Sequence, residues 1–314
     1  MENYRIESLL GEGAQGKVYL VSDLRTSEFL TMKVYNKISP KLDAEINILK
    51  KLGDVCQPHI LCFKEKIIQD GKTYLFFSYA VGYNLEELDY DPSSVEDLLW
   101  SLLEQMLQVL DVLESRNVVH RDLKLANIIY NPATNIFTLL DFGLSCSEDC
   151  STFSGTPAYF SQELTNAFQY DKKITRDMLF RNDAYALGNV AFRIANNDLP
   201  YQAVSMEGPF GSINIDFKQP ERWNNINLSS SLIYVIDRLI AGQNKASTFI
   251  PFFQKAKALR NRSRPSLDEI VGPNEIKFAA LQEMAQKAGT VWEGLQKKDL
   301  YFRLYLVGLI PIKG

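Results

Sequence analysis

Four polar side chains between residues 120 and 143 have the types and spacing needed for one kind of chemistry. They are an acid, a lysine, an amide and a second acid on two loops joined by an apolar hairpin: Asp122, Lys124, Asn127 and Asp141. The carboxylate of Asp122 could accept a proton from a hydroxyl group. Mg²⁺ prefers oxygen ligands such as those of Asn127 and Asp141, and Lys124 could neutralise developing negative charge. The set predicts transfer of a phosphoryl group from a metal-bound nucleotide to a hydroxyl.

The order of motifs in this region resembles that of the eukaryotic-type protein kinase family. His-Arg-Asp-Leu-Lys at residues 120–124 is followed by Asn127 and then by Asp-Phe-Gly at residues 141–143. The lysine two positions after the first aspartate is typical of the serine/threonine branch. The resemblance covers residues 4 to 272 and rests on several motifs in the expected order. It implies transfer of the γ-phosphoryl group of Mg·ATP to serine or threonine hydroxyls of protein substrates.

The resemblance also implies a bilobal α+β fold. A small antiparallel β-sheet lobe with one helix is expected over a larger, mainly helical lobe, with ATP between them. We expect residues 1–80 to form the small lobe and residues 81–272 the large lobe. Residues 273–314 are expected to form a helical extension docked on the kinase body.

A glycine-rich turn is expected to cover the nucleotide phosphates. Gly11, Gly13 and Gly16 lie between two stretches that alternate apolar and polar residues, which predicts a strand on each side. A dinucleotide-binding fingerprint would instead lead into a helix. Glycines let backbone N–H groups approach phosphate oxygens, although a plain hairpin turn has the same composition. By resemblance, Val18 should cover the adenine.

The resemblance implies that Lys33, on the next expected strand, reaches the α- and β-phosphates. Its expected partner is Glu45, on a helix that an apolar stripe predicts over residues 40–52, and Asp43 is the alternative. Thr31 replaces the alanine that is usual in the family and should re-tune the adenine pocket.

An apolar strand over residues 73–79 resembles the segment that leads into the hinge between kinase lobes. Backbone groups form the adenine contacts there, so side-chain identity is loosely constrained. By resemblance, four further residues should line the adenine and the ribose, the first two through their backbones: Ser78, Ala80, Asn84 and Ile129.

Residues 144–154 resemble the activation segment of the family. Thr152 is the expected phosphorylation site, and a phosphate there should pair with Arg121 and order the segment. The acidic residues Glu148 and Asp149 could instead supply constitutive negative charge.

Two further contacts are expected near the end of this segment. Thr156 should bond to Asp122 and Lys124. Glu163 closes a Ser-Gln-Glu sequence where the family has Ala-Pro-Glu, and it should form a buried ion pair with Arg264. Both histidines of the chain are expected to have structural roles.

The remaining sequence reads as helices and connecting loops. A long apolar-rich helix is expected over residues 98–113 and another over residues 232–240, whereas residues 200–220 read as loop-rich. By resemblance, Asp183 is the helix-start aspartate that holds the backbone of the catalytic loop, and an aspartate at that position is also a good cap. The charge-rich residues 164–182 could set substrate choice or form a surface loop.

Composition and charge exclude several other classes. The 314-residue chain has a net charge of −4, which gives no sign of binding to nucleic acid or to a membrane surface. Neither a signal peptide nor a membrane span is evident, so an intracellular, cytoplasmic location is expected. The chain has only two histidines, so reduced thiols are favoured over a zinc site for its four cysteines: Cys56, Cys62, Cys146 and Cys150.

Two alternatives to a protein kinase stay open. A pseudokinase would keep the fold and bind nucleotide or partners without phosphoryl transfer; Thr31, the altered ending at Glu163 and the short gap from Lys33 to Glu45 are consistent with it. A kinase of small molecules is the other, against which the Gly-Thr sequence at residues 155–156 argues. The expected partners are ATP and a protein substrate, and the sequence names no regulatory partner.

Overall fold

The computed structural model describes residues 2–13, 16–35, 40–56, 58–91, 93–197, 199, 202–208, 211–216 and 228–260. The chain forms two compact units, each built from segments that are distant in sequence. The first comprises residues 1–89, 109–156 and 174–179. The second takes in residues 90–108, 157–173 and the described residues from 180 onward. The boundaries expected at residues 80 and 272 stay predictions.

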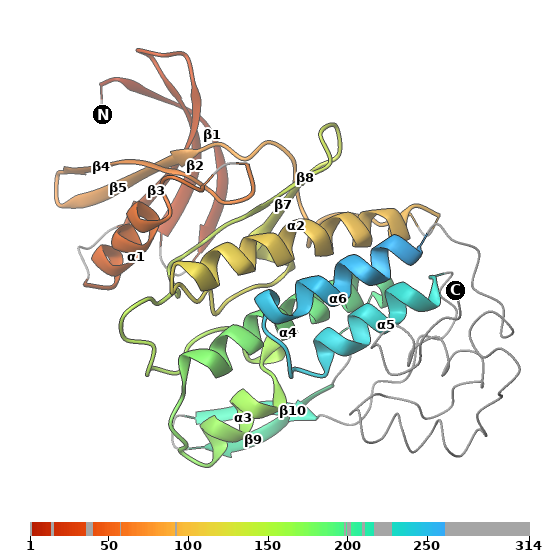
Figure 1. Ribbon diagram of the computed structural model, residues 1–314. Coiled ribbons are helices and arrows are strands. Elements are labelled where there is room, and N and C mark those ends of the chain that lie inside the picture. The colour runs from red at the N-terminus through yellow and green to blue at the C-terminus, as the bar shows by residue number, and fades with distance from the viewer. Residues whose placement is uncertain are drawn as a thin grey trace, which may run out of the picture. The chain divides into compact units, whose positions relative to one another are not determined.

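A five-stranded antiparallel sheet opens the first unit (Figure 1). In spatial order its strands are β1 (Tyr4–Gly13), β2 (Gly16–Asp23), β3 (Phe29–Tyr35), β5 (Lys72–Ser78) and β4 (Phe63–Gln69). Alternation of side chains places one set of apolar residues on a common face, where they form a buried cluster. The cluster consists of Tyr4, Val21, Leu30, Met32 and Phe76.

The helix predicted over residues 40–52 is confirmed as α1 (Pro40–Lys51), which lies beside this sheet (Figure 1). Its apolar stripe recurs at helical spacing and is buried: Leu42, Ile46, Leu49 and Leu52. Burial of this stripe fixes the rotation of α1 about its axis, and with it the face on which each acidic residue lies.

A small three-stranded sheet carries the loops with the polar motifs. Its strands are β6 (Tyr83–Asn84), β7 (Ile128–Asn131) and β8 (Ile136–Leu139), and a short 3₁₀ helix, η1 (Leu125–Asn127), precedes β7. β7 and β8 pair antiparallel, with Ile128 opposite Leu139. The Leu140 N–H also donates to the Asn127 carbonyl at 2.8 Å. The predicted hairpin therefore brings the loop of Asn127 beside the loop of Asp141.

The long helix predicted over residues 98–113 is confirmed as α2 (Val95–Ser115). Its apolar positions are buried at helical spacing: Leu99, Leu102, Leu103, Met106, Leu107 and Leu110. The Trp100 indole packs against the Phe253 ring, with centroids 5.5 Å apart. Such a wide apolar surface suits a helix that lies inside a fold rather than at its edge.

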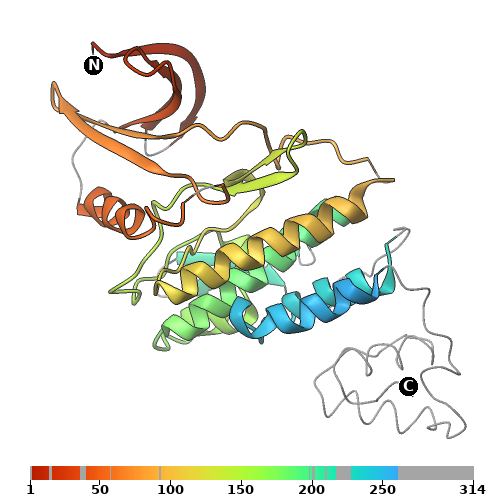
Figure 2. The same cartoon turned by 45° about the horizontal axis from the view of Figure 1, so that its top comes forward.

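The second unit is mainly helical (Figure 2). Most of α2 belongs to it, the 3₁₀ turn η2 (Pro157–Tyr159) follows in sequence, and α5 and α6 run side by side. The predicted helix over residues 232–240 is confirmed as α5, with Ser229 as its N-cap. The helices are α3 (Gln162–Gln169), α4 (Arg176–Asn196), which begins in the first unit, α5 (Ser230–Ile240) and α6 (Ala246–Leu259).

Two sequence-based expectations are wrong in this part of the chain. The stretch read as loop-rich contains two antiparallel strands, β9 (Gln202–Gly208) and β10 (Gly211–Asp216), and the glycine and proline in the sequence between them favoured a loop over the alternation on either side. Asp183 is not at a helix start, because α4 begins seven residues earlier, at Arg176. The Thr175 hydroxyl accepts the N–H of Met178 at 3.2 Å and is the cap instead.

The helices of the described residues were compared with the length and composition of a membrane span. None of the helices there combines the length and the apolar composition needed to cross a bilayer.

Candidate active site

His120 fixes the loop that carries the first aspartate. Its side chain is fully buried, and its Nε2 lies 2.9 Å from the carbonyl oxygen of Leu140. The N–H of Asp122 donates to its Nδ1 at 3.3 Å. The imidazole also packs edge-on against Phe142, with ring centroids 5.0 Å apart. His120 thus ties the loop of Asp122 to the Asp-Phe-Gly loop, a structural role in agreement with the sequence-based expectation.

The second histidine also has a structural role. The Nδ1 of His59 lies 3.0 Å from the carbonyl oxygen of Phe137 in β8. The contact joins the loop after α1 to the small sheet.

Asp122 lies at the centre of a network of hydrogen bonds. The Thr156 hydroxyl donates to its Oδ1 at 2.5 Å, and the Lys124 Nζ lies 2.9 Å from its Oδ2. Lys124 also donates to the Thr156 hydroxyl at 3.0 Å. Asn127 donates from Nδ2 to the Asp122 carbonyl at 2.7 Å and to Oδ2 at 3.1 Å. The expected contact of Thr156 with both Asp122 and Lys124 is therefore present.

Lys33 lies between two carboxylates. Its Nζ is 3.1 Å from Oδ1 of Asp141 and 3.8 Å from Oε1 of Glu45. Glu45 is 4% exposed, because it follows the buried side of α1. Asp43, the alternative partner, lies about 200° away around the helix and pairs with Lys66 at 2.9 Å.

The pKa values of this cluster follow from burial and charge. Burial alone lowers the pKa of Lys33, but the Glu45 and Asp141 carboxylates outweigh it, so this pKa lies above its ordinary value. Burial raises the pKa of Glu45, and the Lys33 charge offsets only part of that effect. Burial also acts to raise the pKa of Asp141, but Lys33 outweighs it and the pKa is lowered. Glu45 is therefore the cluster member whose carboxylate protonates first as pH falls.

Tyr35 belongs to this cluster and was missed from the sequence. Its hydroxyl donates to Oε2 of Glu45 at 3.1 Å, and the Lys33 Nζ lies 5.2 Å from its ring centroid. Burial raises the pKa of the Tyr35 hydroxyl, so it stays a donor. Tyr35 lies two residues after Lys33 in β3, and the two-residue period of a strand puts both on one face. The two-residue spacing from Lys33 along a strand is the sequence signal that could have identified Tyr35.

The glycine-rich turn joins β1 to β2, with Gly13 opposite Gly16. Gly16 has φ +152°, and a Cβ there would lie 1.9 Å from the Val34 carbonyl oxygen, so only glycine fits. A Cβ at Gly11 would meet no atom within 4 Å. Val18 lies opposite Lys33 in the β2–β3 register. The strands expected on both sides of the turn are therefore present; Ala14 and Gln15 lie outside the described residues.

Backbone bonds anchor the expected adenine edge at the end of β5. The Ser78 N–H donates to the Cys62 carbonyl at 2.9 Å, and its hydroxyl accepts the Cys62 N–H at 3.1 Å. Gly82 has φ +144°, and a Cβ there would lie 2.3 Å from the Tyr130 carbonyl oxygen and 2.9 Å from the Ile129 side chain. Close approach at Gly82 thus brings the chain after Ala80 against β7.

Asn84 is engaged within the chain at both ends of its amide. Its Nδ2 donates to the Ala126 carbonyl at 2.7 Å, and its Oδ1 accepts the Glu86 N–H at 2.9 Å. The side chain therefore braces η1 against β6, and its expected contact with a ribose stays a prediction. Thr31 is half-buried in β3, opposite Phe77 of β5.

Residues 4–273 match the family model described as protein kinase domain. The chain belongs to the protein kinase family. The matched span agrees closely with the resemblance traced over residues 4 to 272, and the α+β architecture fits the family.

Relatives of this protein kinase include proteins of plants and animals. CBL-interacting protein kinase 2 of Oryza sativa subsp. japonica is 27% identical over 285 residues, which cover 84% of this chain and 62% of that protein. CBL-interacting serine/threonine-protein kinase 2 of Arabidopsis thaliana is 27% identical, over 70% of this chain and 49% of that protein. Serine/threonine-protein kinase 36 of Pongo abelii is 27% identical, over 71% of this chain and 17% of that protein. The chain spans about half the length of the two plant relatives.

The donor set of the kinase site fits a cation that arrives with a nucleotide. Among the described residues, no group of three or more His, Cys, Asp or Glu side chains could hold a metal ion by itself. Mg²⁺ bound to substrate phosphates needs only one or two protein ligands. Asn127 uses its Nδ2 within the loop, which leaves Oδ1 for a cation. Asp141 receives Lys33 and the Gly143 N–H on Oδ1, which leaves Oδ2.

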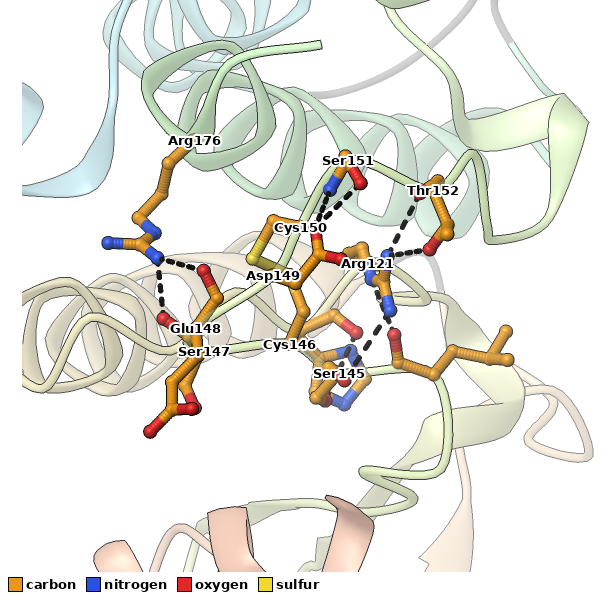
Figure 3. Close-up of a disulfide and its surroundings, with 12 residues drawn as sticks. Arg121, Ser145, Cys146, Ser147, Glu148, Asp149, Cys150, Ser151, Thr152 and Arg176 are labelled. Carbon is orange, nitrogen blue, oxygen red and sulfur yellow. Dashed lines mark hydrogen bonds between the residues drawn. A yellow bond between two sulfur atoms is a disulfide. The ribbon is translucent and has the colours of Figure 1, made fainter. Parts of the chain in front are cut away.

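The Arg121 guanidinium donates several hydrogen bonds to the activation segment (Figure 3). It donates to the carbonyl oxygens of Leu144 at 2.5 Å and Ser145 at 3.4 Å. It also donates to the carbonyl oxygen of Thr152 at 3.0 Å and to its hydroxyl at 3.2 Å. Arg121 and Asp141 both have positive φ, +69° and +52°, a conformation that non-glycine residues adopt rarely.

The expectation of reduced thiols is wrong in this structure. Cys56 bonds to Cys62 and Cys146 to Cys150, and no cysteine is free. Separations of six and four residues do not reveal a disulfide, since the chain must also turn to bring the Cα atoms together. The turns do so here, with Cα–Cα distances of 5.0 and 5.4 Å.

Glu163 takes a partner that the sequence did not indicate. Arg181 of α4 donates to its carboxylate in a bidentate contact, at 2.7 and 3.0 Å. The Glu163 side chain is 41% exposed in this pair, and the buried pair expected with Arg264 stays a prediction. Arg264, the expected partner, lies outside the described residues. Because Arg181 belongs to the charge-rich stretch, part of that stretch braces α3.

Proposed function

We propose that this chain is a serine/threonine protein kinase, which transfers the γ-phosphoryl group of Mg·ATP to hydroxyl groups of protein substrates. One observation carries the proposal: a single unit holds both the charged cluster around Lys33 and the network around Asp122. Family membership and relatives named as serine/threonine-protein kinases support it.

In this proposal the first unit holds the nucleotide. Lys33, positioned by Glu45 and Tyr35, binds the α- and β-phosphates, and the backbone of the glycine-rich turn covers them. Ser78 contributes its carbonyl, since its N–H is engaged by Cys62. The residues proposed to bind the nucleotide are Gly11, Gly13, Gly16, Val18, Thr31, Ser78, Ala80, Asn84 and Ile129.

Asp122 takes the proton of the acceptor hydroxyl. The hydroxyl oxygen forms a bond to the γ-phosphorus while the bond from that phosphorus to the oxygen of the departing ADP breaks. Thr156 and Asn127 hold the Asp122 carboxylate, and Lys124 offsets charge on the transferring group. Mg²⁺, held by Asn127 and Asp141, supplies positive charge at the phosphate oxygens when bound.

We also propose that phosphorylation of Thr152 regulates the site. The Thr152 hydroxyl already lies 3.2 Å from the Arg121 guanidinium, so a phosphate there needs little rearrangement to pair with it. Because the donor is ATP and the acceptors are proteins, we place the activity inside the cell.

Replacement of the proton acceptor tests the proposal. Asp122→Asn keeps the size of the side chain and removes its basicity, so kcat should fall at least about 10²-fold. Asp70→Asn is the matched control, because Asp70 lies at the exposed β4–β5 turn with φ +51°, which asparagine tolerates. Phosphorylation of a generic basic protein is the readout. Near-normal turnover by Asp122→Asn contradicts the assignment, and ATP binding without transfer by the unmutated chain indicates a pseudokinase.

A further inference from the structure

A disulfide lies inside the segment whose order the proposed activity depends on. Cys146 and Cys150 close a loop of the chain just after the Asp-Phe-Gly residues 141–143. Cys146 is fixed at its backbone: its N–H donates to the Val119 carbonyl at 3.0 Å and its carbonyl accepts the Val119 N–H at 2.9 Å. Val119 lies two residues before Arg121. Cys146 is therefore anchored beside the start of the loop that carries Arg121 and Asp122.

The other sulfur belongs to the part of the segment that reaches Arg121. Cys150 precedes Thr152 by two residues, and Thr152 contacts the Arg121 guanidinium through both its carbonyl and its hydroxyl. The disulfide thus joins the fixed Cys146 to the stretch that carries Thr152 (Figure 3). Thr156, four residues further on, contacts Asp122.

Within the described residues, hydrogen bonds from Arg176 and the positive charge of Arg121 near Asp149 act on the closed loop. Arg176 donates from one guanidinium nitrogen to the carbonyls of Ser147 at 2.5 Å and Glu148 at 3.0 Å, on the opposite side from Arg121 (Figure 3). Asp149 accepts the N–H and the hydroxyl of Ser151 at 2.9 and 2.6 Å. Glu148, Asp149 and Ser151 are exposed, and so is Thr152. A segment with little buried surface opens readily, so the covalent link contributes much of its order.

We propose that Cys146 and Cys150 form a reversible oxidation site that controls the order of the activation segment, and through it the rate of phosphoryl transfer. The inference rests on the proposed kinase function. With the disulfide closed, Thr152 is held at Arg121 and Thr156 at Asp122. With two thiols, Cys146 keeps its backbone bonds to Val119, but the stretch from Ser147 to Thr152 is released.

The redox step needs a thiol reductant and a peroxide. One thiolate of a dithiol reductant attacks one sulfur of the disulfide, which forms a mixed disulfide and releases the other cysteine as a thiolate that takes up a proton. The second thiol of the reductant then attacks the mixed disulfide and completes the exchange. The products are two cysteine thiols and the cyclic disulfide of the reductant. In reverse, hydrogen peroxide oxidises one thiol to sulfenic acid with loss of water, and the second thiol condenses with it, losing another water. The sulfurs lie in residues 5% and 8% exposed, so attack requires the loop to open.

The site leaves the nucleotide cluster untouched, which gives the proposal a specific kinetic signature. In the part of the chain that the structure describes, Lys33 and Glu45 contact Asp141 and Tyr35, none of which belongs to the loop from Cys146 to Cys150. Reduction should therefore lower kcat for a protein substrate about tenfold and change KM for ATP less than about twofold, and peroxide should restore kcat.

The experiment compares the full chain in both redox states. One sample is treated with hydrogen peroxide and the other with dithiothreitol; alkylation and mass spectrometry of peptides report the state of each cysteine, and phosphorylation of a basic protein reports kcat. Cys146→Ser/Cys150→Ser should have the low kcat of the reduced chain under both conditions. Cys56→Ser/Cys62→Ser, which removes the other disulfide, should keep the ratio of oxidised to reduced kcat of the unmutated chain.

Hydrogen exchange separates failure of this inference from failure of the kinase proposal, because it requires no activity. Residues 144–156 should exchange faster after reduction in the unmutated chain and equally fast in both conditions in Cys146→Ser/Cys150→Ser. Equal exchange and equal kcat in verified oxidised and reduced chains overturn the inference. So does a response that persists in Cys146→Ser/Cys150→Ser, or a Cys146–Cys150 pair that peroxide leaves as thiols.

Discussion

At the scale of single residues, the site depends on how Lys33 is shared between two carboxylates. Asp141 lies closer, at 3.1 Å, and Glu45 lies at 3.8 Å, beyond hydrogen-bond distance. Glu45 is nevertheless almost fully buried, where an ionised carboxylate needs further donors. Tyr35 supplies one of them. The hydroxyl therefore offsets a Lys33–Glu45 contact that is long for an ion pair in the interior.

Loss of the Tyr35 hydroxyl should weaken the cluster. Tyr35→Phe removes a hydrogen bond to a charged group, worth about 1.5 kcal/mol, so kcat/KM for ATP should fall about tenfold. Burial already raises the pKa of Glu45, and loss of the donor raises it further. Because the Lys33–Glu45 pair is lost as pH falls through that pKa, the acid limb of the activity profile should move to higher pH.

Tyr74→Phe is the matched control, since Tyr74 is a half-buried tyrosine of β5 that packs on the sheet core. It should leave the acid limb in place. An unchanged profile in Tyr35→Phe contradicts the role given to this hydroxyl.

Residue-level expectations from the sequence were strongest where a motif carries both the residue type and its spacing. The contacts among Asp122, Lys124 and Thr156 follow from such motifs. Tyr35 escaped because its role depends on the face of a strand and on the rotation of α1, which no motif contains. The cysteine pairs escaped because bonding depends on how the chain turns between them.

At the scale of elements, apolar periodicity located α1, α2 and α5, since the residues of a buried stripe recur in the sequence at helical spacing. It did not locate the start of α4. Thr175 and Asp183 are both good caps, and only packing decides which of them begins the helix. The β9–β10 pair was missed because glycine and proline in the sequence between the two strands are typical of a loop.

The activation segment is the element in which a single hydroxyl should have the largest effect. If a phosphate on Thr152 pairs with Arg121, Thr152→Ala should lower kcat about tenfold, since charge-assisted pairs with a phosphate order such loops. Ser151→Ala is the matched control, because the Ser151 hydroxyl bonds to Asp149 instead. Mass spectrometry that finds fully active enzyme with unmodified Thr152 rules the regulation out.

The turn between β2 and β3 should give the fold a pH-dependent component. Arg25 donates to both carboxylate oxygens of Asp23, at 2.9 and 2.7 Å, which lowers the pKa of Asp23 to about 2. A lowered folded-state pKa gives stability that is present above the unfolded-state value near 4 and lost as pH falls toward 2. Asp23→Asn should therefore destabilise the chain at pH 7, and about half of that difference should be gone by pH 3.

Urea unfolding of both chains between pH 7 and pH 3 measures this difference. Asp70→Asn, which alters an exposed carboxylate at the β4–β5 turn, is the control for a surface carboxylate. A difference between Asp23→Asn and the unmutated chain that stays constant across this range contradicts the assignment.

At the scale of the whole molecule, the chain is a protein kinase by family, with every residue of the Lys33 and Asp122 groups in the first unit. The sequence predicted this fold class because kinase motifs occur in a fixed order. It did not predict that segments distant in sequence interleave, because contacts between them depend on packing across the whole chain.

The most direct test of the account is transfer of labelled γ-phosphate to a basic protein, followed by identification of the phosphorylated amino acids. The unmutated chain should label serine or threonine, Asp141→Ala should label neither, and Asp111→Ala, on α2, should behave like the unmutated chain. Equal labelling by Asp141→Ala, or nucleotide binding without any labelling by the unmutated chain, contradicts the account.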